Sequence, residues 1–181
     1  MQPENNFTES TGHICRGCDF IGCGNAGAIS LNGVDSLVEN CYFTSSNGGD
    51  AIYLNGFRNT IRGNRFIAWN LPSGSTQHTD IFQSFKSGSG TGVEQSQDHI
   101  IENNIIADCN GCQIGNVDWV GSPVQIQNWT FRNNVFARIT NPLNLYAPGF
   151  KFYNNTFYKC GNPGSGAGNI LHYSVERGSA N

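Results

Sequence analysis

Apolar residues recur along this chain in short groups that repeat at a fixed distance. The hexapeptide Ala28–Gly33 (AISLNG) returns 23 residues later as Ala51–Gly56 (AIYLNG), with five of six residues unchanged. The same distance separates Leu37–Phe43 from Thr60–Phe66. A fixed repeat of this length is typical of solenoids, in which each repeat packs only on its neighbours. Alternation of apolar and polar residues within the groups predicts short β-strands.

Aligning the repeats gives columns of similar residues. An apolar anchor closes each repeat, at Phe20, Phe43, Phe66, Ile106, Phe136 and Phe157. Five residues earlier stands a second apolar column: Cys15, Val38, Ile61, Ile101, Phe131 and Phe152. Both columns are predicted to be buried. Coils of parallel strands place equivalent residues on top of one another about 4.8 Å apart, whereas the antiparallel strands of a sandwich do not.

Two further columns are polar. Two residues before the anchors stand Cys18, Cys41, Asn64, Asn104, Asn134 and Asn155. We expect these Asn to stack at a turn, each bonding its equivalents above and below while tolerating a left-handed backbone. Four residues before the anchors stand Arg16, Glu39, Arg62, Glu102, Arg132 and Tyr153, whose alternating charges predict an exposed row of ion pairs.

These columns resemble those of the right-handed parallel β-helix superfamily, which includes pectate lyases, other polysaccharide lyases, epimerases, glycoside hydrolases and phage tailspikes. The resemblance runs from about Cys15 to Tyr173. It implies an all-β solenoid of about six to seven coils of roughly 23 residues, forming one domain over residues 1–181. Because a bare terminal coil offers unpaired strand edges, we expect another chain to cover one end, giving a homo-oligomer, or the chain to be part of a longer solenoid.

The amino-acid composition limits which binding partners and which location are expected for the protein. Charged residues are only 13% of the chain, and 23 Gly favour a turn-rich protein. A net charge of −3 gives no broad basic surface, so nucleic acid is not an expected partner, and no apolar run is long enough for a membrane helix. The polar start lacks the apolar core of a signal peptide, so the compartment stays unknown; an extracellular or periplasmic location would require a truncated start.

Seven Cys raise the question of a metal site. Cys15-x-x-Cys18 and Cys109-x-x-Cys112 have zinc-ligand spacing, but the repeat places the two pairs three coils apart. Cys23, Cys109 and Cys160 each lie three residues past an anchor and share a column. We therefore favour a structural role for the cysteines and predict no metal site, although Cys18 and Cys41 could approach disulfide distance.

The repeat is interrupted in one region. The interval from Phe66 to Ile106 is 40 residues, 17 more than one repeat, which places insertions at about 69–77 and 84–98. A smaller insertion falls within 116–128. The first two flank the strand His78–Gln83. If Ile81 occupies the column of Ile52, then His78, Asp80 and Phe82 face outward, and Gln83 faces inward in place of Leu54.

Loops on a rigid scaffold commonly carry function, so this strand is the predicted ligand groove. Its His-x-Asp-x-x-Gln pattern resembles one in some bacterial carbohydrate-active β-helix proteins. The candidate catalytic residues are His78 as base, Asp80 as its orienter or a metal ligand, and Lys86 or Arg62 as charge neutraliser. The candidate substrate-binding residues are Tyr53, Phe82, Gln83, Trp69, Trp119 and Arg62. The alternatives are that His78 and Asp80 only anchor loops, and that Arg62 belongs to the charge row.

The expected function is therefore carbohydrate binding or carbohydrate chemistry, with a polysaccharide or oligosaccharide as partner. If the protein is an enzyme, a lyase or epimerase acting on an acidic glycan fits better than a hydrolase, because the motifs of polygalacturonases are missing. No cofactor is expected; calcium alone stays open, because Asp50 and Asp80 occupy similar places on adjacent coils. The competing hypothesis is a non-catalytic adhesion, tail-fibre or assembly module.

Overall fold

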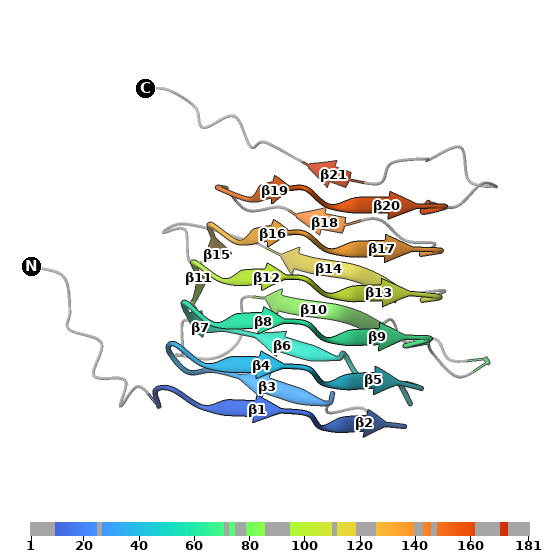
Figure 1. Ribbon diagram of the computed structural model, residues 1–181, viewed down its shortest axis with the longest axis horizontal. Coiled ribbons are helices and arrows are strands. Elements are labelled where there is room, and N and C mark those ends of the chain that lie inside the picture. The colour runs from blue at the N-terminus through green and yellow to red at the C-terminus, as the bar shows by residue number, and fades with distance from the viewer. Residues whose placement is uncertain are drawn as a thin grey trace, which may run out of the picture.

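A computed structural model of the protein shows coils of short parallel strands stacked along one axis, with β1 at one end and β21 at the other (Figure 1). The structure describes residues 10–24, 27–70, 73–74, 79–85, 95–109, 112–118, 126–139, 143–145, 148–161 and 171–173. None of these residues lies in a helix, so no described segment could cross a membrane as one. The expectation of a parallel β-helix is confirmed.

Each coil contributes one strand to each of three large sheets, named here after their first strands. The β1 sheet holds β1 (Ile14–Arg16), β4 (Leu37–Glu39), β8 (Thr60–Arg62), β12 (Ile100–Glu102), β16 (Thr130–Arg132) and β19 (Lys151–Tyr153). The β2 sheet holds β2 (Asp19–Ile21), β5 (Tyr42–Thr44), β9 (Arg65–Ile67), β13 (Ile105–Ala107), β17 (Val135–Ala137) and β20 (Thr156–Tyr158). The β3 sheet holds β3 (Ile29–Leu31), β6 (Ile52–Leu54), β10 (Thr79–Phe85), β14 (Cys112–Asp118), β18 (Leu143–Leu145) and β21 (Leu171–Tyr173). A narrow fourth sheet holds β7 (Gly56–Phe57), β11 (Ser96–Gln97) and β15 (Ile126–Gln127).

The two apolar columns form the core, as predicted. Phe43 pairs with Phe20 and Phe66, and its ring stacks on theirs at centroid distances of 4.7 and 4.5 Å. Ile106 continues the column between Phe66 and Phe136. The second column runs in register from Cys15 to Phe152.

Left-handed corners separate the strands of a coil. Residues 35, 40 and 45 have positive φ, and so do 58, 63 and 68 and their equivalents in later coils, always five residues apart. Arg58 and Ala68 adopt this conformation although they carry a Cβ, which disfavours it. The corner N–H groups bond carbonyls of the next coil, as Ala68 does to Ala107 at 3.0 Å. Stacking therefore holds the corners in place, and the residue after each corner turns inward.

The predicted Asn ladder lies at these inward positions. The Oδ1 atom of Asn104 accepts from the backbone N–H and the Nδ2 of Asn64, at 2.9 and 3.0 Å, and its own Nδ2 donates to Asn134 and to the Ile61 carbonyl. Asn134 and Asn155 repeat the pattern. One detail of the prediction is wrong: the left-handed backbone belongs to the preceding residues, such as Asn103 and Asn133. The residue at the corner adopts the left-handed backbone, and the buried Asn amide that follows it forms hydrogen bonds with backbone N–H and C=O groups of the core.

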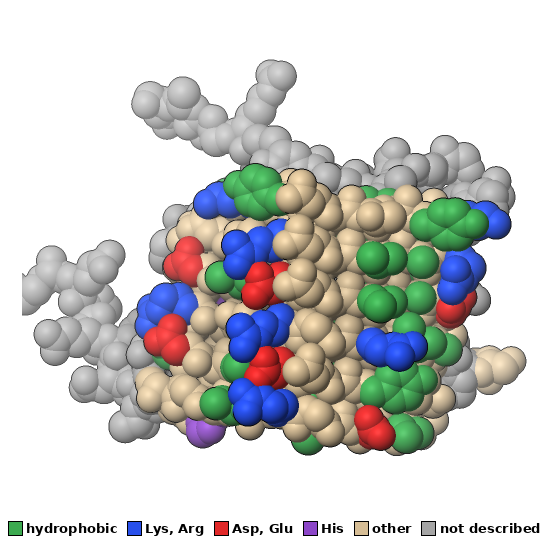
Figure 2. Space-filling view, in the orientation of Figure 1, with side chains coloured by type: hydrophobic (Ala, Val, Ile, Leu, Met, Phe, Trp, Pro, Cys, Tyr) green, Lys and Arg blue, Asp and Glu red, His purple; other side chains and the backbone are tan. Residues whose placement is uncertain are grey.

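The charge row is also present on the outer face of the β1 sheet. Glu39 accepts hydrogen bonds from Arg62 at 2.7 Å and from Arg16, and both bonds hold the pKa of its carboxyl below the usual range. Arg132 pairs with Glu102 at 2.6 Å. Figure 2 shows these charges alternating in one column, while the side chains over the β2 sheet are mostly hydrophobic with some charged ones among them.

The aromatic stack makes a direct stability prediction. Replacing Phe43 with Ala removes a fully buried ring that stacks on both sides, and should lower the free energy of unfolding by about 3–5 kcal/mol. Tyr42→Ala, at the neighbouring half-buried position, is the control and should cost clearly less. Chemical denaturation measures both. Equal losses in the two variants would show that Phe43 is not a core residue.

Candidate functional site

The strand β10 lies one residue out of the register that the sequence predicts. Phe82, not Ile81, pairs with Ile52, and Gln83 pairs with Tyr53. Phe82 is fully buried and packs edge-on against Phe66, with ring centroids 5.4 Å apart. The expectation that Phe82 faces outward is therefore wrong, and a ring with no exposed surface cannot stack on a sugar. The preceding insertion accounts for the error, because its length sets the register.

The shift also reverses the neighbours of Phe82. By strand alternation Gln83 faces outward with Tyr53, and the prediction that it replaces inward Leu54 is wrong. Ser84 takes that inward place, where it is fully buried and donates to Asn55 Oδ1 at 3.0 Å. A hydroxyl paired with an amide satisfies the polar groups of this coil.

Asp80 is fully buried rather than exposed in a groove, which contradicts its predicted outward position. It lies one coil above Asp50, itself 4% exposed, and the Asp80 backbone N–H donates to Asp50 Oδ1 at 2.7 Å. The expected adjacency of these two carboxyl groups is thus correct. Ca²⁺ takes six to eight oxygen ligands, far more than these two side chains supply, so we build no calcium site on them.

Other predicted site residues are dispersed. Trp69 is fully buried, with its Nε1 donating to the Gly49 carbonyl and to Thr79 Oγ1 at 3.1 Å, so it forms no groove wall. Arg62 lies in the β1 sheet with Glu39, away from the β3 sheet that carries Tyr53. His78, Lys86 and Trp119 lie outside the described residues. Both Trp69 and Ser84 fall within regular coil positions, so the insertions begin later than predicted.

The structure instead reveals a row of polar residues along the β3 sheet. Register links one position of every strand, at Ser30, Tyr53, Gln83, Asn116, Asn144 and His172. Each has a hydroxyl, amide or imidazole group, which can form hydrogen bonds. We call these six positions the polar row. The sequence carries a weak signal for it, because Ile29–Leu31, Ile52–Leu54 and Leu143–Leu145 all have a polar residue between two apolar ones.

The row crosses the part of the sheet where the strands are longest. β10 and β14 have seven residues each and pair over six positions, whereas the other strands have two or three. At Tyr53 the aromatic ring lies over Gly27, where an added Cβ would sit 3.3 Å from the ring. Gly27 also has φ of +79°, so a glycine both forms this bend and makes room for the tyrosine. The geometry thus fixes a half-buried phenol beside Gln83, which keeps 7% of its surface exposed.

His99, which directly precedes β12, is a fully buried imidazole. Its Nδ1 accepts the Asn59 backbone N–H at 3.1 Å, and its Nε2 lies 3.0 Å from Ser96 Oγ. It therefore extends a second inward column that begins with Ser36, whose N–H donates to Asn59 Oδ1. Burial lowers the pKa of His99 to about 3, so the imidazole is neutral and structural, not a catalytic base at the surface.

Comparison with known protein families shows where this chain belongs. The family model described as the right-handed β-helix region matches residues 6–174, nearly the whole chain. No curated protein and no solved structure matches the chain.

The burial of neutral His99 predicts that the folded chain loses stability in acid. Its pKa is lower in the folded chain than the ordinary value of 6.5, so the unfolded chain binds one more proton between pH 6.5 and about 3. The contribution of His99 to the free energy of unfolding is fully present above pH 6.5 and is lost as the pH falls towards 3. Lowering the pH from 6.5 to 4.5 should therefore cost about 2–3 kcal/mol through His99 alone.

The control is His99→Gln, which replaces the imidazole with an amide that can still form hydrogen bonds but cannot take up a proton. Urea unfolding at several pH values should show a smaller loss over this range in the variant than in the wild type. Parallel losses in both proteins would contradict the assignment of a buried neutral imidazole.

Proposed function

Because the chain belongs to the right-handed β-helix family, we propose that it binds or modifies a polysaccharide along the outer face of the β3 sheet. The polar row is the observation that supports this proposal. It places one residue of a type that can form hydrogen bonds in register on each coil, at successive steps of about 4.8 Å. A linear glycan presents hydroxyl groups at regular steps as well, and the long shallow face of a solenoid suits such a ligand.

Tyr53 and Gln83 are the proposed centre of the binding surface. The phenol is half-buried and held over Gly27, so its ring is positioned before a ligand arrives. Gln83, the next residue in the row, adds an amide that can donate and accept. An aromatic face beside an amide matches the apolar face and hydroxyl rim of a sugar. The two remaining aromatic candidates of this strand region, Phe82 and Trp69, support the surface from within the core.

If the protein is catalytic, a lyase or epimerase is the reaction class we favour. Such a reaction needs a base to remove a proton next to a carboxylate and a group to neutralise the charge that forms. His78 is the proposed base and Lys86 the proposed neutraliser, because they border β10 at its two ends in the sequence. The burial of Asp80 suits a carboxylate that orients an imidazole better than one that touches substrate.

One feature of the coil stack favours the alternative of an assembly module. Among the described residues, β1, β2 and β3 each pair with another strand on one side only. Ile14 and Ile21, from the same terminal coil, are 62% and 65% exposed. A second chain or a further coil placed there would continue the sheets and flank both residues on their open side.

Substitution within the polar row tests binding. Tyr53→Ala and Gln83→Ala should each weaken binding to acidic polysaccharides by about tenfold, the effect of losing roughly 1.4 kcal/mol of contact. Tyr153→Ala is the matched control, because that tyrosine is 52% exposed on the β1 sheet. A glycan array followed by calorimetry measures the affinities. If no glycan binds, or if all three variants bind alike, the proposed surface is wrong.

Turnover is tested separately, by the release of unsaturated or epimerised products from acidic polysaccharides. His78→Ala should abolish turnover while leaving binding and melting temperature nearly unchanged, since a base acts only in the chemical step. Asp80→Asn should reduce the turnover number more than it changes KM, and should broaden the dependence of rate on pH. Loss of melting temperature without loss of rate would assign both residues to loop anchoring instead. Binding without turnover in the wild type would favour the non-catalytic alternative.

A further inference from the structure

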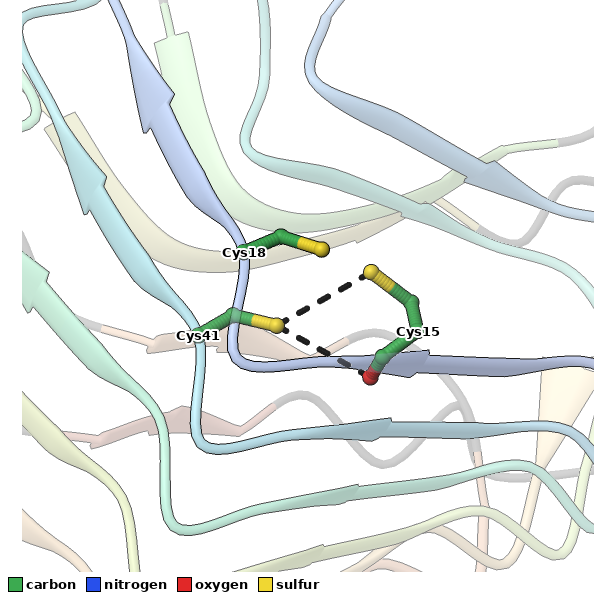
Figure 3. Close-up of side chains that lie close together, drawn as sticks. All are labelled: Cys15, Cys18 and Cys41. Atoms are coloured by element: carbon green, nitrogen blue, oxygen red, sulfur yellow. Dashed lines mark hydrogen bonds between the residues drawn. The ribbon is translucent and has the colours of Figure 1, made fainter.

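Three thiols converge near one end of the coil stack. Cys15 lies in β1, Cys18 follows that strand, and Cys41 stands one coil above, after β4 (Figure 3). Their sulfur atoms all lie within 4.8 Å of one another, and those of Cys15 and Cys41 are 3.8 Å apart. In the described part of the chain these are the only three ligating side chains grouped so closely. None of the three forms a disulfide bond in this structure.

The repeat does not require cysteine at any of these places. Cys18 and Cys41 occupy the column in which Asn64 and Asn104 build the ladder, and Asn64 Oδ1 accepts the Cys41 N–H as the ladder's last bond. A thiol at Cys41 cannot offer the same amide bonds to the coil below. Cys15 occupies the column of Val38. Two columns with different preferences, one polar and one apolar, thus both change to cysteine at the same corner.

We propose that Cys15, Cys18 and Cys41 form a binding site for a soft d¹⁰ cation, with Zn²⁺ as the first expected ion. Zinc binds thiolate sulfur at about 2.3 Å, so two sulfurs of a tetrahedral site lie about 3.8 Å apart. The Cys15–Cys41 separation already has this value, and the other two pairs need to close by less than about 1 Å to reach it. Three protein thiolates leave a fourth position for solvent, and thiolate ligands select zinc and copper(I) over calcium and magnesium.

The position of the cluster allows an ion to enter. Cys18 is exposed, Cys15 is half-buried and Cys41 is buried, so the thiols lead from the surface into the end of the core. Arg16 and Glu39, which lie close to Cys15 and Cys41 in the chain, form an ion pair with each other on the outer face of the β1 sheet. A bound ion would link the first two coils at the place where the Asn ladder ends.

A nucleophilic role for the cluster is less consistent with its surroundings. Burial, followed by hydrogen bonding and charge interaction with Cys18 and Cys41, raises the pKa of Cys15 to about 12. A reactive cysteine has a lowered pKa and an electropositive environment. The pairing of Cys15-x-x-Cys18 with Cys109-x-x-Cys112 that the spacing suggests is not needed, because Cys41 supplies the third sulfur.

The test uses the full chain, reduced with a thiol-free phosphine and titrated with cadmium(II) chloride. We expect one equivalent of Cd²⁺ to bind with thiolate charge-transfer absorption, and three thiols to become protected from a thiol-reactive dye. Zn²⁺ should compete for the same site and raise the melting temperature.

The repeat itself supplies variants that should fold. Cys18→Asn and Cys41→Asn restore the ladder residue, and Cys15→Val restores the residue of the next coil. Each should weaken Cd²⁺ binding at least tenfold. Cys23→Ala, on the same coil but outside the cluster, is the control and should bind as the wild type does.

Three results would overturn the proposal. The first is that the wild type binds no stoichiometric Cd²⁺, and the second is that the Cys15→Val and Cys41→Asn variants bind Cd²⁺ as tightly as the wild type does. The third result combines two measurements. On mild oxidation the purified chain loses the mass of two hydrogen atoms and two reactive thiols, and in the reduced chain Cd²⁺ protects no thiol from the dye. That result would make the cluster a disulfide site.

Discussion

The fold depends on the side-chain amides of Asn64, Asn104, Asn134 and Asn155. Within the column, each Oδ1 of Asn104 and Asn134 accepts two hydrogen bonds from the coil before, and each Nδ2 donates two. The amides of Asn64, Asn104 and Asn134 are buried, so a missing partner would leave an unsatisfied polar group in the core. The same bonds fix the vertical register of successive coils. That register in turn aligns the Phe stack, the charge row and the polar row of the β3 sheet.

Much of this arrangement could be predicted because residues that contact one another on adjacent coils of a solenoid recur at a fixed distance in the sequence. The columns of Phe43, Val38 and Asn64 were evident from a constant offset, and the structure confirms their register. The left-handed corners were harder to place. Arg58 and Ala68 are unusual there, and only stacking on neighbouring coils explains them. No local residue preference would have identified the corners at Arg58 and Ala68, whereas Asn103 and Asn133 are of a residue type that adopts the left-handed backbone readily.

The prediction was wrong between Phe66 and Ile106, where the repeat distance is no longer 23 residues. A one-residue difference in the length of an insertion moves every side chain of β10 to the opposite face, which is why Phe82 and Asp80 are buried rather than exposed. Trp69 could have been placed correctly, because it lies three residues past Phe66, as Cys109 does past Ile106. The repeat correctly brings Cys18 close to Cys41, 23 residues later, but it does not predict that Cys15 joins them: Cys15 belongs to an apolar column, yet its sulfur lies 3.8 Å from that of Cys41, 26 residues later in the chain.

The most direct test of the ladder is hydrogen exchange of Asn side-chain amides, followed by nuclear magnetic resonance. Asn103 and Asn104 are neighbours in sequence, and so are Asn133 and Asn134, but only the second member of each pair is buried. The account predicts that the Nδ2 protons of Asn104 and Asn134 exchange only when the whole coil stack opens, while those of Asn103 and Asn133 exchange rapidly. Equally rapid exchange in all four residues would contradict a buried amide ladder as the basis of the fold.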